Sequence, residues 1–337
     1  MADKVEGAPP VLAAHGAAAL PRVRVDAYNA ELRDAEGFIG DRASKRAFRA
    51  LLDDWRERLR RFGEDPLGEE PSDTVSKKTL DSVLESDDLE AIGVVHGAIE
   101  DFAQILAGVV RRLLRLKSWQ DTQRIVIGGG FRQSRIGELT IGRTAVLLKA
   151  GGLNIELKPI THHPDEAGLI GAVHLAPSWI FTGHDALLAL DIGGTNIRVG
   201  VVEPALAEAD DLSACRVRRS SLWRHADDKP GRERAVERLV DMIEEQIARA
   251  RKDKLRLAPF IGIACPGAIG PDGSIERGGQ NLPGNWESSR FNLPQRIREA
   301  IATIDGHATA VVMHNDAVVQ GLSEAPFMGD VKRWGVL

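Results

Sequence analysis

The chain is poor in the residues on which several classes of protein depend. Its 337 residues include only two cysteines, Cys215 and Cys265, too few for a disulfide framework or a four-ligand zinc site. Aromatic residues make up 5% of the chain, and 44 basic residues face 49 acidic ones, which leaves a net charge of −5. Without a long block of like charge, nucleic acid is not expected as the main ligand. We therefore expect a reducing, cytoplasmic compartment, with both cysteines as small core residues.

Long apolar runs are also scarce. The segment "APPVLAAHGAAAL" is interrupted by proline, histidine and glycine and lacks the basic start of a signal peptide, so residues 1–30 are expected to form a poorly ordered arm. No other stretch approaches the roughly 20 apolar residues that cross a bilayer. The sequence therefore predicts no membrane contact.

What is present is the composition of an ordinary globular protein, with 43% apolar and 28% charged residues over a length sufficient for two domains. The segment "SKRAFRALLDDWRERLRRFG" has apolar residues at helical spacing and predicts an amphipathic helix that ends at Gly63. A second helix is predicted in "HGAIEDFAQILAGVVRRLLRL", and the arginines of both segments are expected to be solvated over a core. From Arg124 onward, predicted strands alternate with helices, which is typical of α/β units.

The stretch "LLALDIGGTNIRVGVV" contains the strongest candidate site. Gly193 and Gly194 allow a tight turn between two strands, and their bare backbone lets amide groups approach an anion. Thr195 adds a hydroxyl, and Asp191 at the strand end can hold magnesium directly or through water. A glycine hairpin is the structural alternative, but it requires neither the aspartate nor the threonine.

A second glycine cluster, "RIVIGGGF", follows an apolar strand earlier in the chain. A dinucleotide-binding crossover would suit such a turn, but the third glycine of that motif and the acidic residue after it are missing. We interpret Gly128, Gly129 and Gly130 as a flat surface for an adenine and its ribose.

The segment "MHNDA" places Asn315 and Asp316 just after a predicted buried strand. A fixed carboxylate can accept the proton of an attacking alcohol, and an amide can bind a neighbouring hydroxyl. Helix capping is the alternative, and on local sequence alone it is the favoured one, because asparagine and aspartate are common N-cap residues.

The loop "CPGAIGPDGSIERGGQNLPGNW" is long and rich in glycine and proline, and loops of this kind are usually functional. Gly267, Gln280, Asn281 and Trp286 could contact a polyol; the alternative is an ordered surface loop anchored by Trp286. His225 shows no pattern that indicates a role.

Taken together, these motifs resemble the ROK family of bacterial sugar kinases and repressors, in the superfamily of actin, heat-shock chaperones and hexokinases. The matching elements are "DIGGTNIRVGVV", "NLPGNW", "NDA" with "GLSE", "IVIGGG" and "DEAGLIGAVHLA", which together span roughly residues 120–337. The resemblance implies an actin-like fold of the α/β class, with two RNase H-like lobes around a nucleotide cleft and an additional helical segment near the N-terminus.

The order of the motifs differs from that of the family, because the segments that close a ROK chain here precede the segments that open it. The sequence thus resembles a circular permutation joined at "PSWIFTGHD". We expect residues 31–180 to form the nucleotide-side lobe and residues 185–337 to form the phosphate-loop and catalytic lobe. The resemblance also places a second phosphate loop, a GTG-type turn, directly after "RWGVL".

The resemblance further implies an ATP-dependent kinase of a hexose or amino sugar, with ATP and Mg²⁺ as cofactors and with a homodimer as a further expectation. Asp316 would be the general base, while Asp191 would organise magnesium. The other implied roles are substrate binding by Asn315, Gly267 and Asn281, phosphate binding by Gly193, Gly194, Thr195 and Asn196, and adenosine contact by Gly128, Gly129 and Gly130.

Two family features are missing: the zinc-binding cysteine cluster and the ExGH motif that contacts sugar. The sugar therefore does not follow from the resemblance, and a kinase of a non-sugar hydroxyl or an acid would differ only in the loop at 266–290. A nucleotide- or sugar-sensing regulator without turnover is the alternative from another class. A DNA-binding repressor is disfavoured, since "SKKTLDSVLESDDLEAIG" is acidic and shows no helix-turn-helix pattern.

Overall fold

The computed structural model describes residues 12–29, 32–35, 37–129 and 134–337. The chain divides into two compact units and enters each of them twice: unit 1 contains Met1–Asn29 and Asp165–Asp330, and unit 2 contains Ala30–Pro164 and Val331–Leu337. The helices are α1 Lys45–Arg60, α2 Lys77–Leu84, α3 Leu89–Leu113, α4 Arg135–Ala150, α5 Pro164–Val173, α6 His225–Asp228, α7 Arg232–Lys252, α8 Leu293–Ala300 and α9 Asp316–Leu322. The strands are β1 Arg33–Asp34, β2 Gly37–Phe38, β3 Arg124–Ile127, β4 Glu156–Pro159, β5 Ala186–Ile192, β6 Ile197–Glu203, β7 Arg216–Trp223, β8 Leu257–Cys265, β9 Ala268–Ile269, β10 Ile275–Arg277, β11 Thr303–Ile304, β12 His307–Ala308, β13 Ala310–Asn315 and β14 Trp334–Val336.

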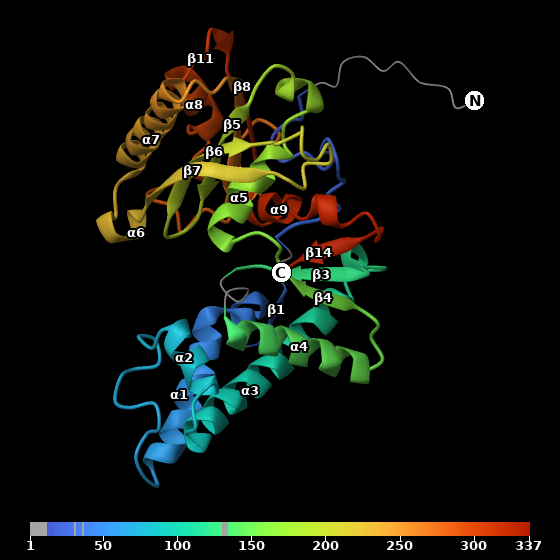
Figure 1. Cartoon of the computed structure of the whole chain (residues 1–337), viewed down its shortest axis with the longest axis vertical. Coiled ribbons are helices and arrows are strands. Elements are labelled where there is room, and N and C mark those ends of the chain that lie inside the picture. The colour runs from blue at the N-terminus through green and yellow to red at the C-terminus, as the bar shows by residue number, and fades with distance from the viewer. Residues whose placement is uncertain (1–11, 30–31, 36, 130–133) are drawn as a thin grey trace, which may run out of the picture. The chain divides into compact units, whose positions relative to one another are not determined.

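Unit 1 is built on a five-stranded mixed sheet with the order β13-β8-β5-β6-β7 (Figure 1). Strands β5, β6 and β7 are antiparallel neighbours, whereas β8 runs parallel to β5 and β13 runs parallel to β8. The predicted alternation of strands and helices from Arg124 onward is present, and the predicted α/β fold class is confirmed.

Both faces of this sheet are covered, so its central strands are buried on both sides. Leu188 and Leu190 of β5 pack with α7 and α8, while Leu187 and Ala189 pack with α5 and α9 (Figure 1). This two-sided burial explains why β5 reads as a continuous apolar run rather than as an alternating one. Both cysteines are buried, as predicted.

Helix α5 contacts its neighbours at distances that only glycine permits. A Cβ added at Gly171 would lie 1.7 Å from the carbonyl oxygen of Val319 in α9, and one added at Gly262 of β8 would lie 2.6 Å from that of Ala172. The segment "DEAGLIGA" therefore packs within unit 1. The unit boundaries accordingly differ from those expected at 180 and 185, because backbone contacts hold α5 to the sheet of unit 1.

The expectation of a poorly ordered arm at 1–30 is wrong for residues 12–29, which we call the N-terminal segment; residues 1–11 lie outside the described part. The backbone N–H of Gly16 donates to the carbonyl of Met313 at 3.0 Å, and the N–H of Met313 donates to Nδ1 of His15 at 3.1 Å. Leu20 is buried in the core beside α5. The segment thus lies along β13, the edge strand that would otherwise be unpaired on that side.

Unit 2 combines a parallel sheet of order β14-β3-β4 with the helices α1 to α4. Helices α3 and α4 pack on Ile125 and Ile127 of β3, and α1 and α2 pack on α3. In the described part of the chain, α3 alone is long and apolar enough to cross a membrane by length and composition, contrary to the expectation of no such stretch. Half of its apolar window is buried against the rest of the unit, which is the situation of a core helix.

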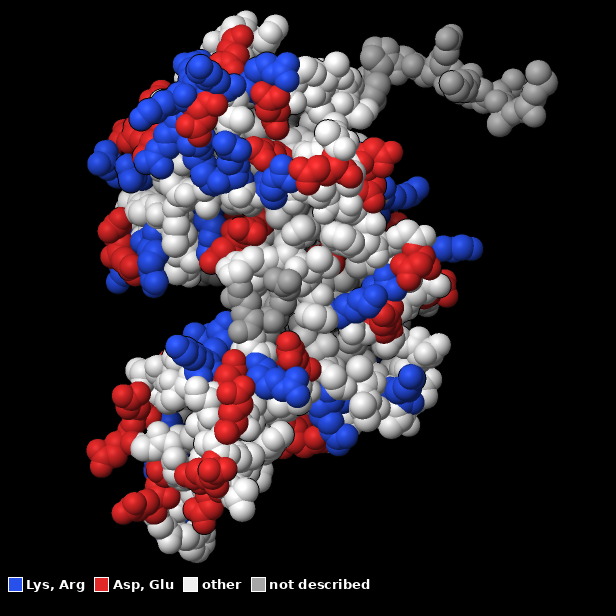
Figure 2. Space-filling model, in the orientation of Figure 1, with Lys and Arg blue, Asp and Glu red and all other residues white. Residues whose placement is uncertain are grey.

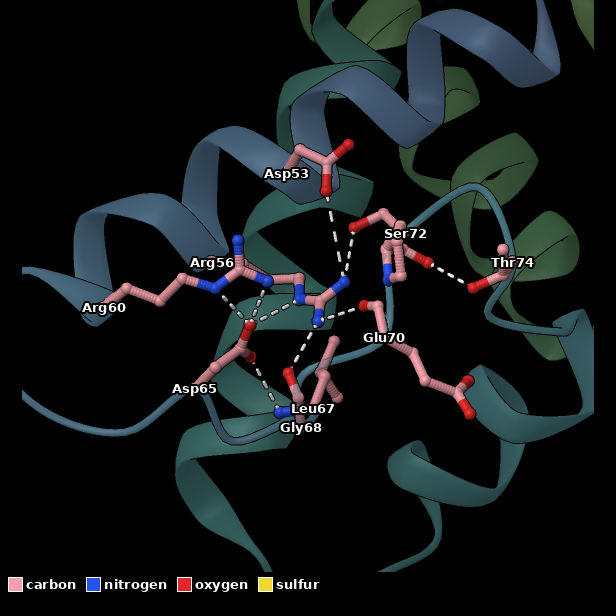
Figure 3. Close-up of polar contacts among 10 residues, drawn as sticks. Asp53, Arg56, Arg60, Asp65, Leu67, Gly68, Glu70, Ser72 and Thr74 are labelled. Carbon is pink, nitrogen blue, oxygen red and sulfur yellow. Dashed lines mark hydrogen bonds and ion pairs between the residues drawn. The ribbon is translucent and has the colours of Figure 1, made fainter.

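The polar loop between α1 and α2 is held by a fully buried arginine (Figure 3). Arg56 donates from Nε to Asp65 and from Nη1 to Ser72, both at 2.8 Å. Its Nη2 donates to the carbonyls of Gly68 and Glu70 at 2.8 and 2.6 Å. The expectation that the arginines of this region are solvated is therefore wrong for Arg56, because the loop folds back over its guanidinium.

Charges of both signs are interspersed on the face shown in Figure 2. Along α7, for example, Arg234 pairs with Glu237 at 3.3 Å and Arg249 pairs with Glu245. Pairs of this kind neutralise one another locally and contribute little to stability when exposed.

Candidate functional site

The candidate site lies where three parallel strands of unit 1 end. In the strand register, Asp191 of β5 is level with Ala264 of β8, and Asn315 of β13 is level with Cys265. Asp316 follows directly as the first residue of α9. The sequence places Asp191 and Asp316 125 positions apart, and the sheet brings them to one edge, where ligands of α/β sheets usually bind.

Asp191 is a buried carboxyl with a shifted pKa. Its side chain lies 3.5 Å from Nη1 of Arg198, which also pairs with Asp165 of α5. Burial raises the pKa of Asp191 to about 6; Arg198 opposes this shift, and the nearby carboxylates of Asp316 and Asp165 add to it. A Cβ added at Gly168 would lie 2.6 Å from Cγ of Asp191, so the approach of α5 buries the carboxyl.

Asp316 is partly exposed, and its immediate partners are neutral. Oδ1 accepts from the backbone N–H of Ala317 at 2.9 Å and from Nδ2 of Asn315 at 3.1 Å. Burial raises the pKa of Asp316, and these hydrogen bonds oppose the rise. A carboxylate with a raised pKa is a stronger proton acceptor than an ordinary aspartate, which suits general-base chemistry.

Asn315 is fully buried, and it caps α9, as the structural alternative predicted. Oδ1 accepts from the N–H of Val318 at 3.2 Å, while Nδ2 donates to the carbonyl of Gly267 at 3.0 Å and to Asp316. The amide therefore orients Asp316 relative to the loop after β8. The predicted contact of Asn315 with substrate remains a prediction.

The glycine turn between β5 and β6 is tight and partly exposed. Gly193 donates its N–H to the carbonyl of Asn196 at 2.8 Å, while Gly194 and Thr195 are exposed. Oδ1 of Asn196 is buried without a hydrogen-bond partner, so it is an acceptor that a hydroxyl or a metal-bound water could satisfy.

His225 is a residue of this site that the sequence did not indicate. Its Nε2 lies 2.8 Å from the carbonyl oxygen of Gly193, and the N–H of Ala226 donates to the carbonyl of Thr195 at 3.2 Å. Helix α6 thus holds the glycine turn from the side of β7. A lone histidine after a strand has no distinctive spacing, so only the fold could reveal this contact.

The loop after β8 contributes two of the predicted residues and its own anchor. Gly267 has a φ of +105°, and an added Cβ would lie 2.5 Å from the carbonyl oxygen of Arg277, so only glycine fits. Asn281 is exposed and lies against the glycine turn, since a Cβ added at Gly194 would be 2.9 Å from the Cβ of Asn281. Trp286 is 1% exposed and donates to the carbonyl of Pro283 at 2.7 Å, which confirms its role as an anchor.

The predicted adenosine-contacting glycines belong to unit 2, unlike the other site residues. The N–H of Gly128 donates to the carbonyl of Leu337 at 2.8 Å, just after strand β14, and Gly129 has a φ of +68°. Gly130 lies outside the described residues. The adenosine contact therefore remains a prediction.

The donor set at the strand ends is compatible with magnesium bound in the presence of a nucleotide. Mg²⁺ is usually held by one or two carboxylates together with phosphate oxygens and water, and Asp191 and Asp316 are two interacting carboxylates. Among the described residues, no group of three or more histidine, cysteine, aspartate or glutamate side chains could form a metal site from protein alone.

Comparisons with solved structures identify partial likenesses. A ROK hexokinase from Thermus thermophilus is 24% identical over 39% of this chain and 35% of its own, with a TM-score of 0.28. A protein described as a candidate N-acetylmannosamine kinase, from Listeria monocytogenes, is 21% identical over the same shares, with a TM-score of 0.26. An exopolyphosphatase-like protein is 16% identical over 75% of this chain and 87% of its own, with a TM-score of 0.31.

The matched region spans about a third of the length of each of the two kinase structures. The description of the first names the ROK family, which the motifs of this chain resemble. No family model matches the chain, and no curated protein matches it.

Proposed function

We propose that the protein transfers a phosphoryl group from ATP to a hydroxyl of a small molecule, with a hexose or amino sugar as the substrate class. The observation that carries this proposal is the pair of carboxylates, Asp191 and Asp316, at the ends of the two strands that flank β8, beside an exposed glycine turn. Phosphoryl transfer depends mainly on positioning and on charge neutralisation, and such a constellation could position the reactants and hold a cation that neutralises phosphate charge.

In this proposal, Asp316 accepts the proton of the attacking hydroxyl. Its partly exposed position leaves room for a substrate, and its raised pKa makes proton transfer more favourable. Asn315 and the backbone of Ala317 hold the carboxylate in one orientation through hydrogen bonds to Oδ1. The second oxygen, Oδ2, is then the atom proposed to receive the proton.

Asp191 and the glycine turn serve the phosphate side in the proposal. A bound magnesium ion would neutralise phosphate charge and favour the ionised form of Asp191, because a nearby cation lowers the pKa of a carboxyl. Gly194 and Thr195 would offer main-chain and hydroxyl donors to phosphate oxygens. His225 would keep the turn in place by donating to the carbonyl of Gly193.

The direct test is ATP consumption by the wild type and by Asp316→Asn in the presence of Mg²⁺. The panel contains aldohexoses, N-acetylhexosamines, glycerol, inositol and hydroxy acids. We expect consumption that depends on one class of substrate and that falls by at least about 100-fold in the variant, the usual contribution of a general base. The matched control is Asp185→Asn, which lies just before β5 and pairs with Arg256 at the surface, and which should retain activity.

Equal rates in the wild type and Asp316→Asn would contradict the role of Asp316. Binding of nucleotide without consumption of ATP on any substrate would instead support the alternative function, a nucleotide- or sugar-sensing regulator without turnover. Activity restricted to glycerol, inositol or a hydroxy acid would identify a kinase of a non-sugar substrate, which the phosphate residues alone do not distinguish from a sugar kinase.

A further inference from the structure

The N-terminal segment ends beside the proposed general base. Oδ1 of Asn29 accepts from Nδ2 of Asn315 at 3.4 Å, and Asn315 in turn donates to Asp316. Nδ2 of Asn29 points toward the loop after β8, where a Cβ added at Gly278 would lie 3.8 Å from it. Asn29 therefore joins the same group of polar atoms as Asn315, Asp316 and Gly267.

The two asparagines differ in their access to solvent. Asn315 is fully buried, whereas Asn29 is exposed and Asp316 is partly exposed. Of these three residues, Asn29 and Asp316 are thus the two that a hydroxyl compound in solution can contact. Asn29 has a φ of +52°, a left-handed conformation that asparagine adopts more readily than most other residues.

Several contacts fix the segment on the N-terminal side of this position. The hydroxyl of the preceding Tyr28 accepts from the N–H of Ile269 at 3.3 Å, and its ring lies 5.2 Å from that of His314 in an edge-to-face arrangement. Nearer the start of the segment, a Cβ added at Gly16 would lie 2.1 Å from the carbonyl oxygen of Ile269. The segment is thus seated against the loop after β8 at two points.

His314 connects the segment to the site by a second route. Its Nε2 lies 3.2 Å from the carbonyl oxygen of Ala17, and its Nδ1 accepts from the N–H of Asn315 at 2.7 Å. Because Nδ1 is an acceptor, the ring carries its proton on Nε2 and donates to Ala17. Burial lowers the pKa of His314 to about 4, so this neutral form persists at physiological pH.

From these contacts we propose that the N-terminal segment forms one wall of the substrate site. Asn29 is a positioning and specificity-determining residue for a polyhydroxylated ligand held at Asp316. Its Nδ2 donates to a ligand hydroxyl, while its Oδ1 keeps Asn315 directed toward Asp316. This proposal deepens the proposed function and rests on it for the class of ligand.

The left-handed backbone at Asn29 determines which substitutions can test this proposal. Asn29→Gly removes the amide without straining a left-handed residue, whereas alanine there would add strain. Asn29→Asp keeps an acceptor for Asn315 but removes the donor proposed to bind the ligand. Arg22→Ala is the matched control in the same segment, because Arg22 donates instead to the carbonyls of Asp210 and Asp211.

The experiment measures kcat and KM for the active polyol and for ATP, together with polyol binding by titration calorimetry without ATP. We expect Asn29→Gly and Asn29→Asp to raise KM and Kd for the polyol by about tenfold, the equivalent of one hydrogen bond of about 1.4 kcal/mol. KM for ATP and the melting temperature should remain at wild-type values. The ratio of kcat/KM between epimeric hexoses should move closer to one in both variants. Arg22→Ala should behave like the wild type.

The proposal is overturned if Asn29→Gly binds and phosphorylates every compound as the wild type does, or if Arg22→Ala has the same effect. A wild type that binds a hexose, N-acetylhexosamine, glycerol or inositol without phosphorylating it would contradict the proposed function. Weaker binding by Asn29→Gly would then still support the ligand contact. A wild type that neither binds nor phosphorylates any of these compounds would contradict both.

Discussion

At the scale of single residues, the two carboxylates of the site have the same chemistry but different surroundings. Asp191 is buried beside Arg198, whereas Asp316 is partly exposed and receives hydrogen bonds from neutral donors. Burial raises the pKa of both groups. Since only Asp316 is accessible, it is the one proposed to exchange a proton with substrate, while Asp191 is proposed to act through charge.

The pKa of Asp191 makes a prediction about stability. Its folded value of about 6 lies above the ordinary value of 3.8, so folding favours the protonated form. That contribution is complete below pH 3.8 and is lost as pH rises through 6. Two pKa units correspond to about 3 kcal/mol. We therefore expect Asp191→Asn to gain about this much in free energy of unfolding, relative to the wild type, between pH 4 and pH 8.

The measurement is urea denaturation of both proteins across this pH range without magnesium. Asp185→Asn is the control at the other end of β5, because hydrogen bonds from Arg256 lower the pKa of Asp185. The stabilising contribution of Asp185 is therefore present throughout this pH range and is lost only in stronger acid, so Asp185→Asn should differ from the wild type by a nearly constant amount between pH 4 and pH 8. A difference between the wild type and Asp191→Asn that does not vary with pH would contradict the assigned pKa.

At the scale of elements, helix α5 shows how packing determines the geometry of the site. Gly168 lets the helix bury Asp191, and Gly171 lets it contact the backbone of α9, which begins at Asp316. Asp165 in its first turn pairs with Arg198. One helix therefore contacts the elements that carry both carboxylates.

We predict that Gly171→Ala destabilises unit 1 and reduces activity. The added Cβ would lie 1.7 Å from a backbone oxygen of α9, which cannot rotate away as a side chain could. Overpacking of this kind typically costs about 1–3 kcal/mol, and the displacement of α9 would move Asp316. Thermal unfolding and kcat measure the two effects.

Gly142→Ala in α4 is the matched control, because nothing lies within 4 Å of the added Cβ there. Alanine is the better helix former by about 0.5–1 kcal/mol, so this variant should be slightly more stable than the wild type. If Gly171→Ala were equally well tolerated, the close contact between α5 and α9 would be contradicted.

At the scale of the whole molecule, the chain forms two units that each have their own core. The sheet of unit 1 is covered on both faces, while the helices of unit 2 pack around α3 and on β3. The chain passes from unit 1 to unit 2, returns at Asp165 and enters unit 2 again at Val331. Both units are therefore built from segments that are distant in sequence.

Separate cores predict separate unfolding. We expect two transitions in scanning calorimetry, with Gly171→Ala lowering only one and Arg56→Met lowering only the other. Arg56 is fully buried against Asp65 and two loop carbonyls, so its replacement should destabilise unit 2 by about 3 kcal/mol. Arg60→Met is the control, because Arg60 also pairs with Asp65 but is 43% exposed. A single transition lowered equally by both variants would contradict independent units.

Local patterns in the sequence were sufficient for the elements and for part of the site. The helical spacing around Phe48 and Leu52 predicted α1, and the apolar run before Asp191 predicted β5, because both signals arise from neighbouring residues. The glycine turn and the segment "MHNDA" were likewise recognised from a few adjacent positions. Their proximity followed only from the parallel pairing of β5, β8 and β13.

By itself, then, the sequence determined the α/β class, most elements and the residue types available for phosphate and proton chemistry. The tertiary structure alone decided that α5 belongs with unit 1, that residues 12–29 are packed, and that Asn29 and His225 lie at the site. The reason is physical: these outcomes depend on contacts between residues far apart in the chain, such as Asn29 and Asn315. Periodicity and short motifs carry no record of such contacts, because they arise only when the chain has folded.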